Sequence, residues 1–153
     1  MPDVNARLSE LGLTLPPVVP PVAAYQPAVR SKDHVYVSGQ LPMVDGALPA
    51  TGLVGQDVTA EQAYDLARVC ALNGLAAIAS VVSLDLVTRI VKVGGFVASA
   101  PGFTGQPAVI NGASELFGEV FGDAGRHARA AVGVAALPLN APVEVDLVVE
   151  VTD

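Results

Sequence analysis

The sequence predicts an α+β domain in which two helices cover one face of a mixed sheet. Extended and amphipathic segments follow one another in the order strand, strand, helix, strand, helix, strand, strand, and the last strand alternates apolar with mostly acidic residues. A short additional strand within residues 41–57, which are rich in Pro, Gly and Asp, would make the sheet six-stranded. Since the helices leave the other sheet face uncovered, we expect a second subunit to cover it.

The first half of the domain is predicted from turn and capping signals. Residues 24–30 and 34–39 are expected to form a strand pair, because the polar stretch between them has the length of a hairpin loop. The first long helix is expected to begin at Thr59, because Gln62 three residues later completes a capping box. Apolar residues then repeat at helical spacing to about residue 82.

The second half alternates in the same way. A run of β-branched residues predicts a strand, in which Gly94 and Gly95 mark a bend or a close backbone approach. A second amphipathic helix is closed by Gly122, and two strands follow it. The predicted bounds are 87–98 for the strand, about 109–121 for the helix, and 130–136 and 143–151 for the last two strands.

Residues 1–20 are expected to form an arm appended to a single domain over residues 21–153. Asp3 is placed to cap a short helix over residues 3–12, and the segment LPPVVPP ends it. Charged residues in the opening segment disfavour a secretory signal, and the longest apolar run is shorter than the ~20 residues that span a bilayer. The expectation is a cytoplasmic protein without a membrane segment.

Composition and charge disfavour several classes of function. Eight Lys and Arg against 15 Asp and Glu give a net charge of −7, which makes nucleic acid an improbable partner. Cys70 is the only cysteine and lies on an apolar helix face, so we expect a core residue and no metal centre. No P-loop or dinucleotide fingerprint is present, so no cofactor is expected. The low charged fraction of 15% favours an oligomer.

The candidate chemistry lies in ionic residues on the last two strands. If LPLNAP is a hairpin loop, the strands pair, and alternation puts Arg129 and Glu144 on one face. The same face would carry Ala131, Gly133 and Asp146. A guanidinium beside small residues can bind a carboxylate through two parallel hydrogen bonds, and a nearby carboxylate can orient or deprotonate water. The alternative is an ordinary solvated ion pair between the strands.

The chain resembles the RidA/YjgF family of reactive-intermediate deaminases, also described as L-PSP endoribonucleases, in four stretches: AYQPAVR, VYVSGQLP, RIVKVGGFVAS and RAAVGVAALPLNAPVEVDLVVEV. The resemblance runs from about Tyr25 to Val151, and residues 1–20 match the arm of the longer branch of that family. Its most specific part is Arg129, a Leu-Pro eight residues later, and the Val-Glu-Val strand around Glu144.

The resemblance implies a chorismate-mutase-like fold that assembles as a homotrimer, with a cleft between subunits. It implies that Arg129 holds the carboxylate of a 2-imino acid and that Glu144 helps to place the attacking water. Tyr25, Gly39 and Asn111 are the implied further substrate-binding residues. The substrate would lose ammonia to give a 2-keto acid, without metal or cofactor.

The sequence departs from the family pattern near this site. Ala131 stands where Cys is often found, His127 where Pro is common, and Gln26 where Ser usually follows the Tyr. A longer loop leads to the second helix, so Ser114 competes with Asn111 for the place of the family Asn. His127 is expected to be a solvated loop residue, with a proton carrier as the alternative.

Three functions follow from these observations. The favoured one is hydrolytic deamination of enamine or imine intermediates. The second is a trimer that binds small carboxylates with little or no catalysis. The third is an endoribonuclease, which the net charge of −7 disfavours because a polyanion would be repelled.

Overall fold

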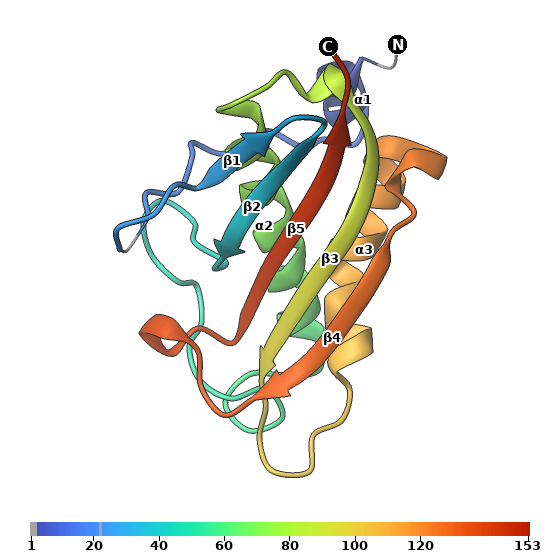
Figure 1. The fold of residues 1–153 in the computed structure, drawn as a ribbon. Helices are drawn as coiled ribbons and strands as arrows, with labels where there is room; N and C mark the ends of the chain where they lie inside the picture. Colours follow the sequence, from blue (N-terminus) through green and yellow to red (C-terminus); the bar gives the residue numbers. More distant parts are fainter. Residues whose placement is uncertain (1–2, 22) are drawn as a thin grey trace.

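Residues 3–21 and 23–153 are described by a computed structural model, in which two long helices cover one face of a twisted sheet (Figure 1). The sheet has five strands in the order β1-β2-β5-β3-β4, and only β3 and β4 are parallel. The elements are α1 (Val4–Glu10), β1 (Ala28–Ser31), β2 (His34–Gln40), α2 (Ala60–Ala79), β3 (Val87–Ala98), α3 (Gln106–Phe121), β4 (Ala128–Val134) and β5 (Val143–Val151). The predicted element order and the α+β class are confirmed.

The predicted sixth strand is wrong. Residues 41–57 make only isolated bridges, one of them between Val44 and Ala47 across a tight turn. Asp45 and Gly46 in this turn both have a positive φ, at 51° and 80°. Such a turn closes on itself after two residues, so the segment cannot extend into a sheet ladder.

The helix boundaries follow the capping signals. Thr59 Oγ1 accepts the Gln62 N–H at 3.1 Å and Gln62 Oε1 accepts the Thr59 N–H at 2.9 Å, which confirms the capping box. Helix α3 ends at Gly122, whose φ is 61°, as predicted. It begins three residues earlier than predicted, because Pro107 is well suited to a first helical turn.

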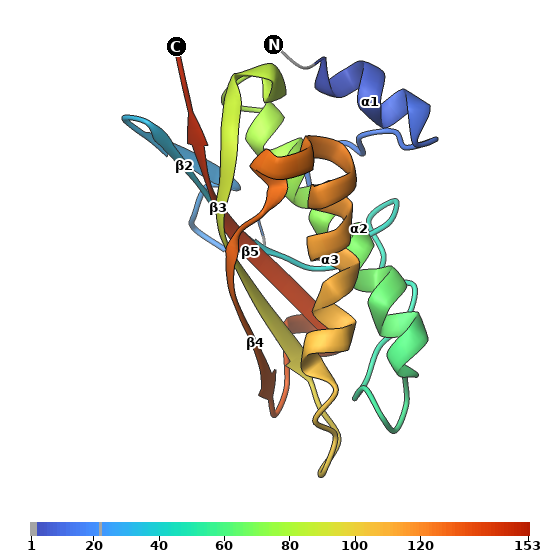
Figure 2. The same cartoon turned by 90° about the vertical axis from the view of Figure 1, so that its right-hand side faces the viewer.

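The core lies between the sheet and the two long helices. Figure 2 views the sheet nearly edge-on, with α2 and α3 on one side of it. The inward residues of β5 are at most 3% exposed: Val143, Val145, Leu147, Val149 and Val151. A Cβ at Gly95 would clash with the Ile110 side chain of α3, so Gly95 allows the predicted close approach. Cys70 is fully buried in this core, and burial raises the pKa of its thiol well above the ordinary value.

The opposite sheet face is left open by the described part of the chain. Tyr36 of β2 is 51% exposed and Val132 of β4 is 44% exposed. Val29 of β1 pairs with Tyr36 and is exposed to the same extent. Large apolar side chains on an uncovered sheet face are typical of a surface that is buried in an assembly.

Helix α1 packs onto the helical layer, on the side of the molecule away from the sheet (Figure 2). The Asp3 side chain accepts the Ala6 N–H, which confirms the predicted cap. Val4 and Leu8 are buried, and Arg7 Nε donates to the Glu119 carbonyl of α3 at 2.8 Å. The division into an arm over residues 1–20 and a domain over 21–153 stays a prediction. Within the described residues, no helix combines the length and hydropathy that crossing a membrane requires.

Candidate active site

Arg129 and Glu144 lie on opposite faces of the sheet, so the predicted hairpin of the last two strands is wrong. Strand β3 lies between β4 and β5, and it pairs Val93 with Arg129 and Phe96 with Glu144. Paired residues project to the same face, and Val93 is fully buried under the helices. Arg129 therefore projects to the helix side, and Glu144 to the open side. Ala131 and Gly133 share the face of Arg129.

The two side chains are also separated within the sheet. Their partners on β3 are three residues apart, and their strands are two positions apart in the sheet order. With ~3.3 Å per residue along a strand and ~4.8 Å between strands, their Cα atoms are roughly 14 Å apart. One protomer therefore carries two separate groups of candidate residues.

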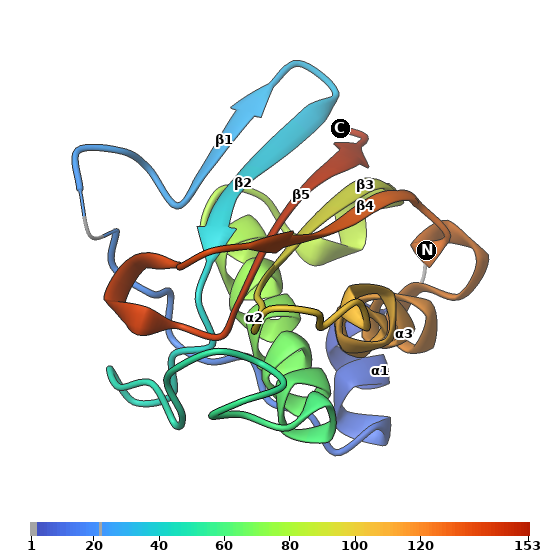
Figure 3. The same cartoon turned by 90° about the horizontal axis from the view of Figure 1, so that it is seen from below.

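The first group, the arginine cluster, consists of Arg129, Asn111, Ser114 and His127. Arg129 Nη1 donates to Asn111 Oδ1 at 2.8 Å and to Ser114 Oγ at 3.2 Å, and Nη2 donates to the Pro107 carbonyl at 3.4 Å. All three acceptors belong to α3, which lies beside β4 in Figure 2 and is seen end-on in Figure 3. Asn111 and Ser114, the two candidates for the place of the family Asn, thus both contact the guanidinium.

The guanidinium keeps capacity for a ligand. Arginine has five N–H donors in one plane, and helix α3 accepts three of them. The remaining two suffice for two parallel hydrogen bonds to a carboxylate. Because Arg129 is only half-buried, such a ligand can reach it from solvent.

His127 is not the solvated loop residue that was expected. Its ring is half-buried, with Nε2 2.8 Å from Ser114 Oγ and Nδ1 2.7 Å from the Gly125 carbonyl oxygen. The ring also lies edge-on to Phe117, with centroids 6.0 Å apart. The prediction of a solvated His127 was wrong because residues 122–125 form a short 3-10 turn against α3 rather than an open loop.

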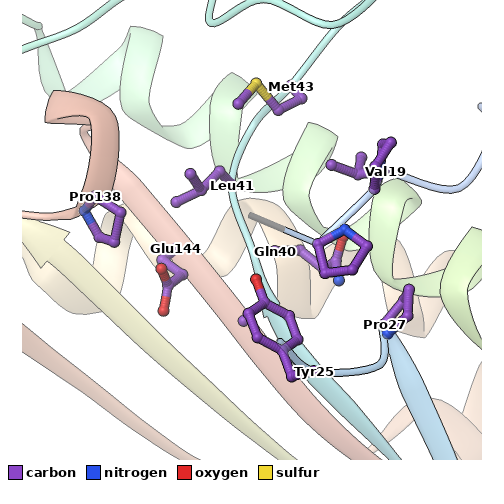
Figure 4. Close-up of a pocket in the computed structure, with 11 residues that line it drawn as sticks. Val19, Tyr25, Pro27, Gln40, Leu41, Met43, Pro138 and Glu144 are labelled. Carbon is purple, nitrogen blue, oxygen red and sulfur yellow. The ribbon is translucent and has the colours of Figure 1, made fainter. Parts of the chain in front are cut away.

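The second group, the glutamate pocket, lies around Glu144 on the open side of the sheet (Figure 4). Glu144 lines it from β5, and Tyr25 lines it from the segment before β1. Burial raises the pKa of Glu144, and the neighbouring Asp146 raises it further. The other lining residues are mostly apolar: Val19, Pro20, Pro21, Pro27, Gly39, Gln40, Leu41, Met43 and Pro138.

Gly39 lines this pocket with its backbone, beside the carboxylate of Glu144. The pairing of β2 with β5 shifts by one residue between Val37 and Gln40, so a bulge removes this stretch from the regular ladder. A Cβ at Gly39 would lie 2.5 Å from Glu144 Oε2. Only glycine therefore lets the carboxylate rest against this strand.

Asn73 supports the pocket and was not predicted to do so. It is buried in α2, and its Nδ2 donates to the carbonyls of Leu41 at 3.0 Å and Met43 at 3.1 Å. These two hydrogen bonds fix the segment that lines the pocket beside Glu144. The sequence signal was present, since Asn73 interrupts an otherwise apolar helix face.

Across residues 3–21 and 23–153, no three His, Cys, Asp or Glu side chains gather in a way that could hold a metal ion. The chemistry available to the described residues is that of a cation with two remaining donors and of a carboxyl group with a raised pKa.

A mixed sheet backed by two helices, with these two groups on its opposite faces, defines an α+β protein of the chorismate-mutase-like class. Residues 5–151 match the family described as "YjgF/chorismate_mutase-like, putative endoribonuclease", and the chain belongs to this RidA/YjgF family.

Several known proteins are similar to this chain over most of its length. Protein TCP17 of Trypanosoma cruzi is 45% identical over 152 residues, which cover 98% of this chain and 95% of TCP17. The crystal structure of Atu1372 from Agrobacterium tumefaciens, a protein of unknown function, is 50% identical with a TM-score of 0.90. That match covers 97% of this chain and 92% of Atu1372. E. coli TdcF with bound serine has the same fold, at 22% identity and a TM-score of 0.65, covering 90% and 94% of the two chains.

Proposed function

We propose that the protein hydrolyses 2-imino acids to 2-keto acids and ammonia, in clefts between the subunits of a homotrimer. The observation that carries this proposal is the arginine cluster, in which α3 holds three donors of Arg129 and leaves two for a substrate carboxylate. Such a fixed fork binds a carboxylate with little loss of side-chain entropy.

The geometry favours a site that is shared between two copies of the chain. In a 2-imino acid, the carboxylate is bonded directly to the carbon that water attacks. Arg129 and Glu144 of one protomer project from opposite faces, with Cα atoms roughly 14 Å apart by strand spacing, so they cannot serve the same substrate. A neighbouring copy on the open face brings its own arginine cluster to the glutamate pocket, and it also buries Tyr36 and Val132.

The reaction needs a water, a proton acceptor and a proton donor. Arg129 binds the substrate carboxylate, and Glu144 accepts a proton from a water whose oxygen bonds to the protonated imine carbon. Glu144 then returns this proton to the amine nitrogen. As the C–N bond breaks, the hydroxyl oxygen forms the C=O bond and gives its proton back to Glu144, so that ammonia and the 2-keto acid leave. A half-buried carboxyl with a raised pKa suits both steps, because its carboxylate accepts a proton more readily than that of a solvent-exposed glutamate.

The lining of the glutamate pocket favours substrates with an apolar side chain. Pro27, Leu41 and Met43 offer no charged partner to a substrate side chain. Tyr25 is 42% exposed at the rim and can cover the bound molecule. E. coli TdcF holds serine within the same fold, which supports an amino-acid-sized ligand here.

The test generates 2-imino acids from leucine, methionine and serine with an amino-acid oxidase and measures keto-acid and ammonia release with and without the protein. Acceleration is expected, and it should be larger for the leucine and methionine products. Equilibrium sedimentation should give three times the chain mass. A stable monomer, or no acceleration at any substrate, contradicts the proposal.

A binding-only trimer is the second candidate, and Ala131 is the observation that favours it. Ala131 packs toward the core on the face of Arg129, so no thiol stands beside the guanidinium, and Cys70 is buried. Saturable binding of 2-keto acids without imine hydrolysis would select this function. The endoribonuclease named in the family description is tested with single-stranded RNA. A net charge of −7 predicts no cleavage.

A further inference from the structure

His127 contacts Arg129 indirectly, through the hydroxyl of Ser114. Ser114 Oγ lies 3.2 Å from Arg129 Nη1 and 2.8 Å from His127 Nε2, and His127 Nδ1 lies 2.7 Å from the Gly125 carbonyl. The sequence places His127 two residues before Arg129 on the approach to β4. Both side chains therefore reach the same turn of α3.

The hydrogen-bond partners fix where each proton lies. A carbonyl only accepts, so the hydrogen of a neutral His127 ring is on Nδ1 and points to Gly125. A guanidinium only donates, so Ser114 Oγ accepts from Arg129 and its own hydrogen is available for Nε2. In this series of hydrogen bonds from Arg129 to Gly125, every donor has an acceptor only while His127 is neutral.

Protonation of His127 would disturb this arrangement. Nε2 would then carry a hydrogen and donate to Ser114 Oγ, which would have to accept from two cations at once. The Ser114 hydroxyl would lose its acceptor, and Arg129 would face a second positive charge. The orientation of the guanidinium then rests on Asn111 and the distant Pro107 carbonyl.

The surroundings of His127 favour its neutral form. Burial lowers its pKa, the Gly125 carbonyl raises it, and the charge of Arg129 on β4 lowers it. From β3, Arg89 donates to the backbone carbonyl of Arg126 at 3.0 Å, which adds another cation nearby. On the turn, Asp123 is paired with Arg126 at 3.8 Å, and on α3 the ring meets Ser114 and Phe117.

We propose that neutral His127 is a positioning residue, which holds Arg129 through Ser114 in the orientation that binds the substrate carboxylate. This inference rests on the proposed function, since it assumes that Arg129 is the carboxylate anchor. It predicts that acidification through the pKa of His127 weakens binding. A purely electrostatic role predicts the opposite sign, because an added positive charge attracts an anion.

The test measures 2-oxobutanoate binding by titration calorimetry at pH 5.5, 6.5 and 7.5, a range in which this ligand stays ionised. Wild type should bind more weakly at pH 5.5 than at pH 7.5, and the loss should approach about five-fold, that of one neutral hydrogen bond, as His127 becomes fully protonated. His127→Gln keeps an acceptor for Ser114 at every pH, so it should bind like wild type at pH 7.5 and lack the histidine-dependent loss. Glu144 is present in both proteins, so its own titration cancels in the comparison.

Two further variants complete the design. His127→Leu should bind roughly five-fold more weakly at pH 7.5, since it removes the hydrogen bond between Ser114 and His127. Ser114→Ala should bind at least as weakly, since it also removes the hydrogen bond from Arg129 to Ser114. His34→Gln, a histidine change on β2, should retain the wild-type profile. If His127→Leu fails to fold, the His127→Gln variant and the pH profile still test whether His127 positions Arg129.

The outcomes separate the inference from the function it rests on. The positioning role alone is overturned if wild type and His127→Gln bind equally well at pH 5.5. It is also overturned if wild-type binding tightens on acidification relative to that variant. Binding that survives Arg129→Ala at full strength overturns the carboxylate anchor, and with it the proposed function.

Discussion

The arginine cluster and the glutamate pocket are built on opposite physical principles. In the arginine cluster, polar side chains of α3 and His127 satisfy one another and hold a charge that stays ionised. In the glutamate pocket, apolar residues surround a carboxyl and raise its pKa. A rigid cation suits binding of a charged group, whereas a destabilised carboxylate suits proton transfer. One protomer therefore holds the cation and the carboxyl apart, and the proposed trimer would bring a cation of one copy to a carboxyl of the next.

The largest effect is expected from a change in the glutamate pocket that removes its proposed proton acceptor. Glu144→Gln should lower imine turnover by about 10²–10⁴-fold, because it removes the proton acceptor. Affinity for 2-oxobutanoate should stay within a few fold, since the glutamine is isosteric. Single-turnover kinetics with calorimetry check both. Glu150→Gln is the matched control on the same strand, and an equal loss there would indicate a bulk-charge effect.

Mixing two inactive variants tests the separation itself. Arg129→Ala and Glu144→Gln chains, refolded together, should regain activity, because one cleft of a mixed trimer can take Glu144 from one chain and Arg129 from the other. Random mixing restores about a quarter of the clefts. Activity no higher than that of either parent would place both residues in a site within one chain.

The arginine cluster is tested by a substitution that changes the shape of the cation and keeps its charge. Arg129→Lys should weaken 2-oxobutanoate binding roughly 10- to 100-fold, almost as much as Arg129→Ala, because lysine lacks the planar fork. Folding should survive, since Arg129 lies near the start of edge strand β4 and is half-buried. Full binding by the lysine variant would make Arg129 a structural residue.

Gly39→Ala should produce a smaller effect, confined to the glutamate pocket. The added Cβ would lie 2.5 Å from Glu144 Oε2, so the carboxylate must move and turnover should fall a few fold. Gly118→Ala is the matched control, because a Cβ there meets nothing within 4 Å. This control should keep full activity and gain up to about 1 kcal/mol of stability as an alanine in a helix. Turnover equal to wild type in Gly39→Ala would show that Glu144 has room to move.

The smallest expected effect concerns stability and pH. Burial raises the pKa of Asp146, against smaller lowering effects of the Gly94 backbone and Lys92. A carboxyl with a raised folded-state pKa stabilises the fold most at low pH, and this contribution is lost as the pH rises through that pKa. Asp146→Asn should therefore melt at a higher temperature than wild type at pH 8, and the difference should shrink at pH 3. A difference that grows on acidification would contradict this account.

The local structure could be predicted from the sequence, because the signals for helix ends and strands act over short distances. The capping pair Thr59 and Gln62, the closing Gly122, and the alternation along residues 143–151 each act over a few residues, and all three are confirmed. The family motif around Arg129 and Glu144 is equally local, and the chain belongs to the family it indicated.

The face of the sheet that each residue occupies could not be predicted in the same way. Strand adjacency is a long-range choice, and the insertion of β3 between β4 and β5 leaves no trace in the spacing of the last two strands. That choice places Arg129 against α3, where it meets Asn111 and Ser114, and places Glu144 on the open face. His127 likewise became a hydrogen-bonded partner only because the turn before β4 packs on α3. Contacts between segments distant in sequence depend on how whole elements pack, and a local pattern carries no record of that packing.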